Sequence, residues 1–223
     1  MAENVIKLNV LLSSPGTLSE ERELVKQVID NINLDSGRRE GFVAELVRWE
    51  THTRPSVGEY SQAVINEQFP DDIDVFVGML GAYFGTPTPH WGSGTEEEFR
   101  IAFESFQSGG SPEIMFYFHD AASRLSSLNL TEVARVQAFR DTIGQEGVYY
   151  WSFQERADLH VLLQRHLNSA LLDRKKAIAA SEADVSRDEA VPMSPLSHYE
   201  KLIAENPLLA IEDLAEVATG DTK

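Results

Sequence analysis

The chain has 223 residues, of which 42% are hydrophobic and 25% are charged, and this size suits one α/β domain with an appendage. Its net charge of −17 disfavours binding to nucleic acid or to an anionic membrane surface. Because it has no cysteine, disulfides, thiolate catalysis and zinc–sulfur sites are excluded.

The first part of the chain alternates strand and helix patterns. Val5–Ser14 is rich in Val, Ile and Leu and predicts a first strand. An apolar stripe that ends at Ile32 predicts the helix that follows it. Val43–Glu50 alternates apolar and polar residues, which predicts a second strand at a more exposed edge of the sheet. Ser61–Phe69 reads as a short helix.

Residues 73–80 form an apolar run with no charge after Asp74, which predicts a strand buried on both faces. A loop rich in Gly, Pro and Thr follows it. The next helix is predicted from apolar residues at i, i+3, i+4 and i+7, namely Phe99, Ala102, Phe103 and Phe106. The helix is expected to end at Ser108–Pro112.

Two more strand–helix pairs complete the pattern. The strands are predicted over Glu113–Phe118 and Val148–Phe153, and the helices over Thr131–Gln145 and from Glu155 to about Ala180. Strands that alternate with helices predict a parallel sheet with right-handed crossovers. We expect a flavodoxin-like five-stranded sheet in the order 2-1-3-4-5 with helices on both faces, because strands one and three are the most apolar.

The character of the chain changes after this domain, which we place at residues 1–180. Residues 181–223 carry ten acidic and three basic side chains, and Val191–Pro195 has the composition of a linker. An acidic, helical appendage is predicted here. Its segment 208–218 has an apolar stripe that we expect to pack on the domain, on a partner or on another copy, made of Leu208, Ile211, Leu214 and Val217.

Residues 73–106 are where chemistry is expected, because ligands of open parallel sheets bind at the carboxyl ends of the strands. Gly94 lets a ligand approach the backbone, and Thr95 can cap the helix. Glu98 would then lie in the first turn, above the strand ends. Thr95-x-x-Glu98 is also the spacing of a capping box, in which Glu98 would only accept a hydrogen bond from the Thr95 backbone N–H.

Several familiar signatures are missing. The chain has no P-loop, and its first strand is not followed by Gly-x-Gly-x-x-Gly. The six histidines are scattered, so we expect no metal site. No run reaches the ~18 apolar residues of a membrane span, and the start at Met1–Asn4 lacks the features of a signal peptide. A cytoplasmic location is the expectation.

Five groups of short motifs occur together within roughly residues 5–170. They are Ser13-Ser14-Pro15 with Glu20-Glu21-Arg22-Glu23, Leu46-Val47-Arg48-Trp49-Glu50-Thr51, Ala63-Val64-Ile65-Asn66, Phe84-Gly85-Thr86-Pro87-Thr88, and Gly92-Ser93-Gly94-Thr95-Glu96-Glu97-Glu98. As a set they resemble a bacterial family of uncharacterised TIR-like domains, whose members often precede signalling ATPases of the STAND type. The Gly-Thr-x-x-Glu element is also similar to that of nucleoside deoxyribosyltransferases.

The resemblance implies an N-glycosidase that acts on NAD or a related nucleotide, as an effector in bacterial anti-phage defence signalling. In deoxyribosyltransferases and TIR-domain NAD hydrolases, a glutamate near this helix acts on an N-glycosidic bond, and the matching residue is Glu98. NAD would be the substrate, and no cofactor or metal is needed because nicotinamide is a good leaving group. The expected substrate-binding residues are Ser13, Ser14, Arg54, Tyr83, Phe84, Trp91, Gly94 and Thr95.

Two other functions stay open. The domain would be a non-catalytic TIR-like module that self-associates or docks on a STAND-type ATPase or sensor, or else a nucleoside ribosyl-transfer enzyme. We expect a homo-oligomer or such a partner. Tyr83, Phe84 and Trp91 also fit simple packing, and Arg54 also fits an ordinary surface position.

Overall fold

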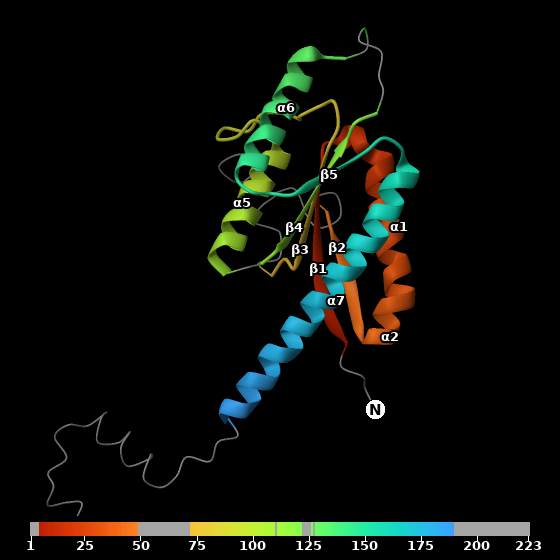
Figure 1. Ribbon diagram of the computed structural model, residues 1–223, viewed down its shortest axis with the longest axis vertical. Coiled ribbons are helices and arrows are strands. Elements are labelled where there is room, and N and C mark those ends of the chain that lie inside the picture. The colour runs from red at the N-terminus through yellow and green to blue at the C-terminus, as the bar shows by residue number, and fades with distance from the viewer. Residues whose placement is uncertain (1–4, 49–71, 110, 122–125, 127, 190–223) are drawn as a thin grey trace, which may run out of the picture. The chain divides into compact units, whose positions relative to one another are not determined.

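Figure 1 shows the computed structural model, which describes residues 5–48, 72–109, 111–121, 126 and 128–189, with side chains up to residue 181. The chain divides into two compact units, residues 1–177 and 178–223. Arg54, the predicted helix Ser61–Phe69 and the segments 191–195 and 208–218 lie outside the described residues.

The first unit alternates strands and helices in the predicted order. The main elements are β1 (Ile6–Ser13), α1 (Ser19–Ile32), β2 (Phe42–Val47), β3 (Val75–Leu80), α5 (Gly94–Gly109), β4 (Glu113–His119), α6 (Leu130–Gln145), β5 (Tyr150–Phe153) and α7 (Arg156–Glu189). All but the C-terminal part of α7 belong to the first unit. A 3₁₀ turn, η1 (Gly16–Leu18), leads into α1. After α1 the chain stays helical through a π turn, η2 (Asn33–Gly37), and α2 (Arg38–Glu40).

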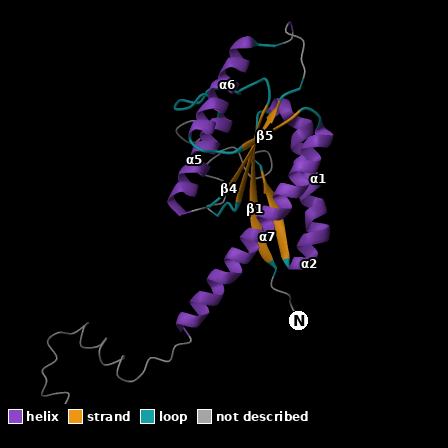
Figure 2. Cartoon of the chain, viewed as in Figure 1, coloured by secondary structure: helices purple, strands orange, loops and turns teal. Residues whose placement is uncertain are grey.

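The described strands form one parallel sheet in the order β2-β1-β3-β4-β5, which confirms the predicted flavodoxin-like topology. Figure 2 shows the strands in orange, between the purple helices. Every residue of β3 is buried, as its apolar run predicts, because the strand has a neighbour on each side and helices over both faces. β2 lies at an edge and alternates between buried and more exposed residues. Gly78 of β3 is necessary for packing, because a Cβ there would lie 2.3 Å from the Phe116 ring.

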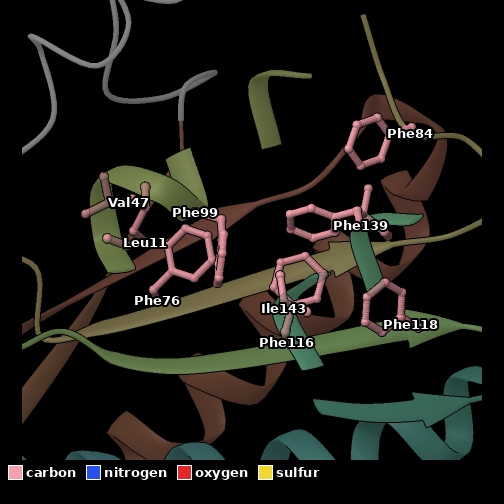
Figure 3. Close-up of a cluster of buried hydrophobic side chains, with 11 residues drawn as sticks. Leu11, Val47, Phe76, Phe84, Phe99, Phe116, Phe118, Phe139 and Ile143 are labelled. Atoms are coloured by element: carbon pink, nitrogen blue, oxygen red, sulfur yellow. The ribbon is translucent and has the colours of Figure 1, made fainter. Parts of the chain in front are cut away.

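Helices cover both faces of the sheet, α5 and α6 on one side and α1 and α7 on the other (Figure 1). An aromatic cluster fills the space between the sheet and α5 and α6 (Figure 3). Phe99 of α5 lies at its centre, with ring centroids 5.8 Å from Phe116 and 5.5 Å from Phe139. This packing fixes the rotation of α5 about its axis, and therefore the direction in which the neighbouring glutamates point.

The predicted inward stripe of α5 is shorter than expected. Phe99 and Ala102 are buried and Phe103 is partly buried, but Phe106 is exposed. Phe106 stacks on Phe103, with centroids 6.5 Å apart, and Phe103 in turn stacks on Phe99. The last turns of the helix therefore contribute less to the core than the periodicity indicates.

α7 is joined to the sheet by apolar and ionic contacts. Leucines at four-residue intervals are buried from Leu159 to Leu171. The Arg174 side chain donates a 2.7 Å hydrogen bond to the buried Asp74 carboxylate, which also accepts the Asn9 backbone N–H at 2.8 Å. The helix continues past the predicted end at Ala180, since no Gly or Pro interrupts it before Pro192. No helix in the described ranges has the length and apolar character needed to cross a bilayer.

Candidate functional site

A cavity of about 280 Å³ lies between the segment after β1 and the segment after β3. β1 and β3 are neighbours in the sheet, and the strand order reverses between them. In open α/β sheets this switch point, at the carboxyl ends of the strands, is where ligands bind. The cavity is lined by Ser14, Pro15, Gly16, Tyr83, Gly85, Thr86, Ser93, Gly94, Thr95 and Glu98.

The start of α5 has a capping box, but not the one that the Thr95–Glu98 spacing suggests. The Ser93 Oγ accepts the Glu96 backbone N–H at 3.1 Å, and the Glu96 carboxylate accepts the Gly92 backbone N–H at 2.9 Å. The box therefore begins two residues earlier, at Ser93-x-x-Glu96. Thr95 lies inside the helix, and the carboxylate that completes this box is that of Glu96.

The three consecutive glutamates of α5 have different environments. Glu96 is part of the cap, and Glu97 is buried away from the cavity. Glu98, with 8% of its surface exposed, lines the cavity together with Thr95. The separation follows from helix geometry, because successive residues are turned by about 100°. Within the described chain, Glu98 is the one acidic residue that lines this cavity.

A buried arginine orients the opposite wall. The Arg22 Nη1 donates hydrogen bonds to the Ser14 carbonyl oxygen at 2.9 Å and to the Ser14 Oγ at 3.1 Å. An arginine has donors but no acceptor, so the Ser14 hydroxyl must accept here. Its own proton is then left for another acceptor, and Ser14 lines the cavity. Arg22 thus makes Ser14 a hydrogen-bond donor toward a ligand.

The third wall, the loop between β3 and α5, is held by two residues of α6. The Glu132 carboxylate accepts the Phe84 backbone N–H at 3.0 Å and the Arg135 guanidinium at 2.6 Å. Arg135 also donates to the carbonyl oxygens of Gly85 and Gly92, at the two ends of the loop. Burial by itself would raise the pKa of Glu132, but the hydrogen bonds from Arg135 and Phe84 outweigh it and lower the pKa.

Gly85 has a structural reason to be a glycine. It lines the cavity with a φ of +113°, a backbone conformation that other residues rarely adopt. A Cβ at this position would also lie 3.1 Å from the Ser93 Cβ. The loop can therefore turn toward α5 and bring Thr86 into the wall only with a glycine here.

The structure brings five of the predicted site residues to this cavity: Ser14, Tyr83, Gly94, Thr95 and Glu98. They come from two segments about 70 residues apart in the sequence, and the parallel pairing of β1 and β3 places those segments side by side.

Three other predicted site residues do not line the cavity. Ser13 is buried at the end of β1, where its hydroxyl has no hydrogen-bond partner among the described residues. Phe84 is part of the aromatic core, with its ring centroid 5.5 Å from that of Phe139. Trp91 lies beneath the Arg100 guanidinium, 5.4 Å from the ring centroid. Phe84 thus fits the simple packing interpretation, whereas Trp91 is an exposed ring that contacts Arg100.

Sequence reasoning missed the residues that hold the site together. Ser93-x-x-Glu96 was readable as a capping box, because the Ser-Gly-Thr-Glu-Glu-Glu run contains two overlapping registers of the motif. No sequence motif marks Arg22, Glu132 or Arg135. Each occupies an ordinary helix position, and its role comes from hydrogen bonds to another segment of the chain. The described residues contain no group of three or more acidic, His or Cys side chains that could hold a metal.

The arrangement combines one carboxylate with several hydroxyl groups. Ser14, Thr86, Ser93 and Thr95 supply neutral donors and acceptors around Glu98. Such a lining suits a sugar, whose hydroxyls make neutral hydrogen bonds while the carboxylate faces positive charge that develops on the ring. It is less suited to an anion, which Glu98 would repel.

A comparison with known protein families matches most of the first compact unit, residues 1–177. A family model described as a domain of unknown function, DUF4062, matches residues 9–168. No curated protein matches the sequence. The matched range runs from β1 into α7 and includes every residue that lines the cavity. Because the match spans more than half of the chain, this protein belongs to the DUF4062 family.

Proposed function

We propose that this domain cleaves the N-glycosidic bond of NAD or a related nucleotide, with Glu98 as its catalytic carboxylate. The observation that carries the proposal is the position of Glu98 in the lining of the switch-point cavity, next to a capping box that Ser93 and Glu96 complete. The resemblance to TIR-like domains and to nucleoside deoxyribosyltransferases supports the same reaction. An effector role in bacterial defence signalling is proposed on that resemblance.

The reaction needs little beyond what the cavity holds. The bond between the ribose C1′ and the nicotinamide nitrogen breaks, and its electron pair leaves with the neutral nicotinamide. Positive charge develops on the ribose in an oxocarbenium-like transition state, as in glycoside hydrolysis. A carboxylate beside C1′ stabilises that charge or attacks the carbon, and water then completes the hydrolysis. Glu98 is the described residue of the cavity that can do either.

The surrounding groups would bind the sugar. Ser14 presents a hydroxyl proton, because Arg22 occupies its acceptor side, and Thr95 adds a second hydroxyl beside Glu98. The cavity volume, about 280 Å³, is near the lower end of the ~300–1,000 Å³ that is usual for ligand pockets. It therefore suits the nicotinamide riboside half of NAD rather than the whole dinucleotide.

The Glu98→Gln variant tests the proposal. It keeps the size and the helix propensity of the side chain but removes the charge, so we expect nicotinamide release from NAD to fall ~100-fold or more. Release is measured by chromatography, on the protein alone and under conditions that force oligomers. The matched control is Glu104→Gln, an exposed glutamate of the same helix, which should keep full turnover. Thermal melting checks that both variants are folded.

The alternatives predict other outcomes. Turnover that is unchanged in Glu98→Gln would remove Glu98 from the mechanism. If the unmutated protein releases no nicotinamide in any assembly state, the non-catalytic interaction module becomes the preferred function. Exchange of labelled nicotinamide into NAD without net hydrolysis would instead identify ribosyl transfer.

A further inference from the structure

A second cavity, of about 240 Å³, lies between β4, β5 and α7. It shares no residue with the Glu98 cavity. β4 turns Phe116 and Phe118 toward α5 and α6, and the alternate residues Met115 and Tyr117 toward this second cavity. His166 and Ser169 of α7 form the other side, so this cavity is on the opposite face of the sheet from the aromatic core.

An aromatic wall lines the cavity. Tyr149 and Trp151 lie on the same side of the chain at β5, with their rings edge to face and centroids 5.9 Å apart. The wall continues from Trp151 to the His166 ring, at 5.4 Å, and from there to Tyr117, at 6.0 Å. Tyr149 is 75% exposed and Trp151 is 38% exposed. A ligand that covered these two rings would remove a large apolar area from water.

The polar groups at the back of the cavity satisfy one another. Arg165 has only donors, so the contact of 3.1 Å between its Nη2 and the His166 Nε2 makes that nitrogen an acceptor. The neutral ring then carries its proton on Nδ1 and donates it to the Tyr117 hydroxyl at 2.9 Å. Tyr117 in turn donates to the Met115 sulfur at 3.8 Å. Burial and the Arg165 charge lower the pKa of His166, so its ring is neutral at pH 7.

One charged group of the cavity has no such partner. No hydrogen bond or ion pair joins the Glu113 carboxylate to another side chain in the described part of the protein, and partial burial with the Asp173 charge raises its pKa. Asp173 is itself paired with Lys176, at 2.9 Å. Glu113 begins β4, four residues before Tyr117, so the carboxylate end and the Tyr117 end of the cavity are about 13 Å apart.

We propose that this cavity binds an organic amine, in which an ammonium group is joined to a flat apolar body. The ammonium group pairs with Glu113 at one end of the cavity. The apolar body lies along the wall formed by Tyr149 and Trp151. Ring faces attract cations as well as apolar groups, and the Arg165 guanidinium, 5.8 Å from the Trp151 centroid, already uses this property from within the chain. The proposal is independent of the reaction assigned to Glu98.

The test compares two probes of similar shape on the full chain. Phenethylammonium carries the charge, whereas phenethyl alcohol replaces the ammonium group by a neutral hydroxyl. Isothermal titration should show that the amine binds about ten-fold more tightly than the alcohol, because only the amine can pair with Glu113. The Glu113→Gln variant should weaken amine binding about ten-fold and leave alcohol binding unchanged. Trp151→Leu should weaken both.

A matched control uses a second partly exposed tryptophan of the described residues. Trp91 is 37% exposed, lies outside this cavity and also has an arginine over its ring, so Trp91→Leu should leave amine binding unchanged. Equal binding of the two probes would overturn the proposal, and so would the absence of any amine binding. An amine affinity that responds equally to Trp91→Leu and Trp151→Leu would place the binding elsewhere and would also overturn it. Melting curves of each variant verify folding.

Discussion

At the scale of single residues, neighbouring glutamates in the first turns of α5 have different roles. Glu96 completes the cap with Ser93, while Glu98 lines the switch-point cavity. The two carboxylates are two residues apart, and their roles differ because about 200° of helix rotation separates them. A structural role for Glu96 is therefore compatible with a chemical role for Glu98.

The cap assignment predicts a stability effect at Ser93 and not at Thr95. Ser93→Ala removes the acceptor of the Glu96 backbone N–H and should lower the free energy of unfolding by about 1 kcal/mol. Thr95→Val keeps the shape of the side chain and removes a hydroxyl that makes none of the cap contacts described above, so we expect a smaller loss than at Ser93. Urea unfolding of the two variants measures both. A loss confined to Thr95→Val, with Ser93→Ala unchanged, would show that the box begins at Thr95 instead.

At the scale of elements, α6 holds the loop that forms one wall of the cavity. Glu132 and Arg135 lie one turn apart on α6, and together they bind backbone groups at both ends of the loop, Phe84 and Gly85 at one and Gly92 at the other. Backbone groups are fixed in this way whatever side chains the loop carries. The loop is therefore shaped before any ligand arrives, which lowers the entropy cost of binding.

The Glu132 contacts predict a pH-dependent contribution to stability. The pKa of Glu132 is lowered in the folded protein, so its stabilising effect is complete above the unfolded value of about 4.3 and is lost as the pH falls through the lowered folded value. Glu132→Gln should therefore be less stable than the unmutated protein at pH 7. The difference should shrink as the pH falls from about 4.3 through the lowered folded value, because below that value both side chains are neutral.

Urea unfolding midpoints at neutral and acid pH measure this difference. Hydrogen exchange adds a local readout, because the Phe84 amide donates directly to Glu132 and should exchange faster in the variant. Glu104→Gln, on the exposed face of α5, is the control and should show no pH-dependent change of this kind. A stability difference between Glu132→Gln and the unmutated protein that is the same at all pH values would rule out the ionic contribution.

At the scale of the whole molecule, the net charge of −17 opposes association between copies. The apolar stripe predicted in segment 208–218 favours association, although this segment lies outside the described residues. The balance between the two should depend on salt, because salt screens repulsion between exposed charges but does not weaken apolar contacts.

We therefore predict that the chain forms a homo-oligomer that salt strengthens. Raising NaCl from about 0.1 M to about 1 M shortens the screening length from about 10 Å to about 3 Å, and the oligomer fraction in sedimentation velocity should rise. Ile211→Asp with Leu214→Asp should reduce association at both salt concentrations by interrupting the stripe. A protein that stays monomeric at high salt would contradict the prediction, and so would a double variant that associates as well as the unmutated chain.

The sequence by itself determined the sheet, because the spacing of apolar residues along a strand depends on whether one or both of its faces are buried. The continuous run at 73–80 indicated the central strand β3, and the alternation at 43–50 indicated the edge strand β2. The predicted strand order, with the rule for ligand sites in parallel sheets, then placed Glu98, Thr95 and Ser14 at the carboxyl ends of the strands. The cavity lies there.

Only the tertiary structure decided which side chains line the cavity and what holds them. Two capping registers overlap in Ser93–Glu98, and the spacing of the residues does not distinguish them. The register is set by the start of α5 at Gly94 and by the packing of Phe99 on the sheet. The Phe84 ring is buried in the core, where it packs against the Phe139 ring and the Arg135 guanidinium. Glu132 is 48 residues from Phe84, and such contacts leave no periodic trace in the sequence because each depends on how two distant segments meet in the fold.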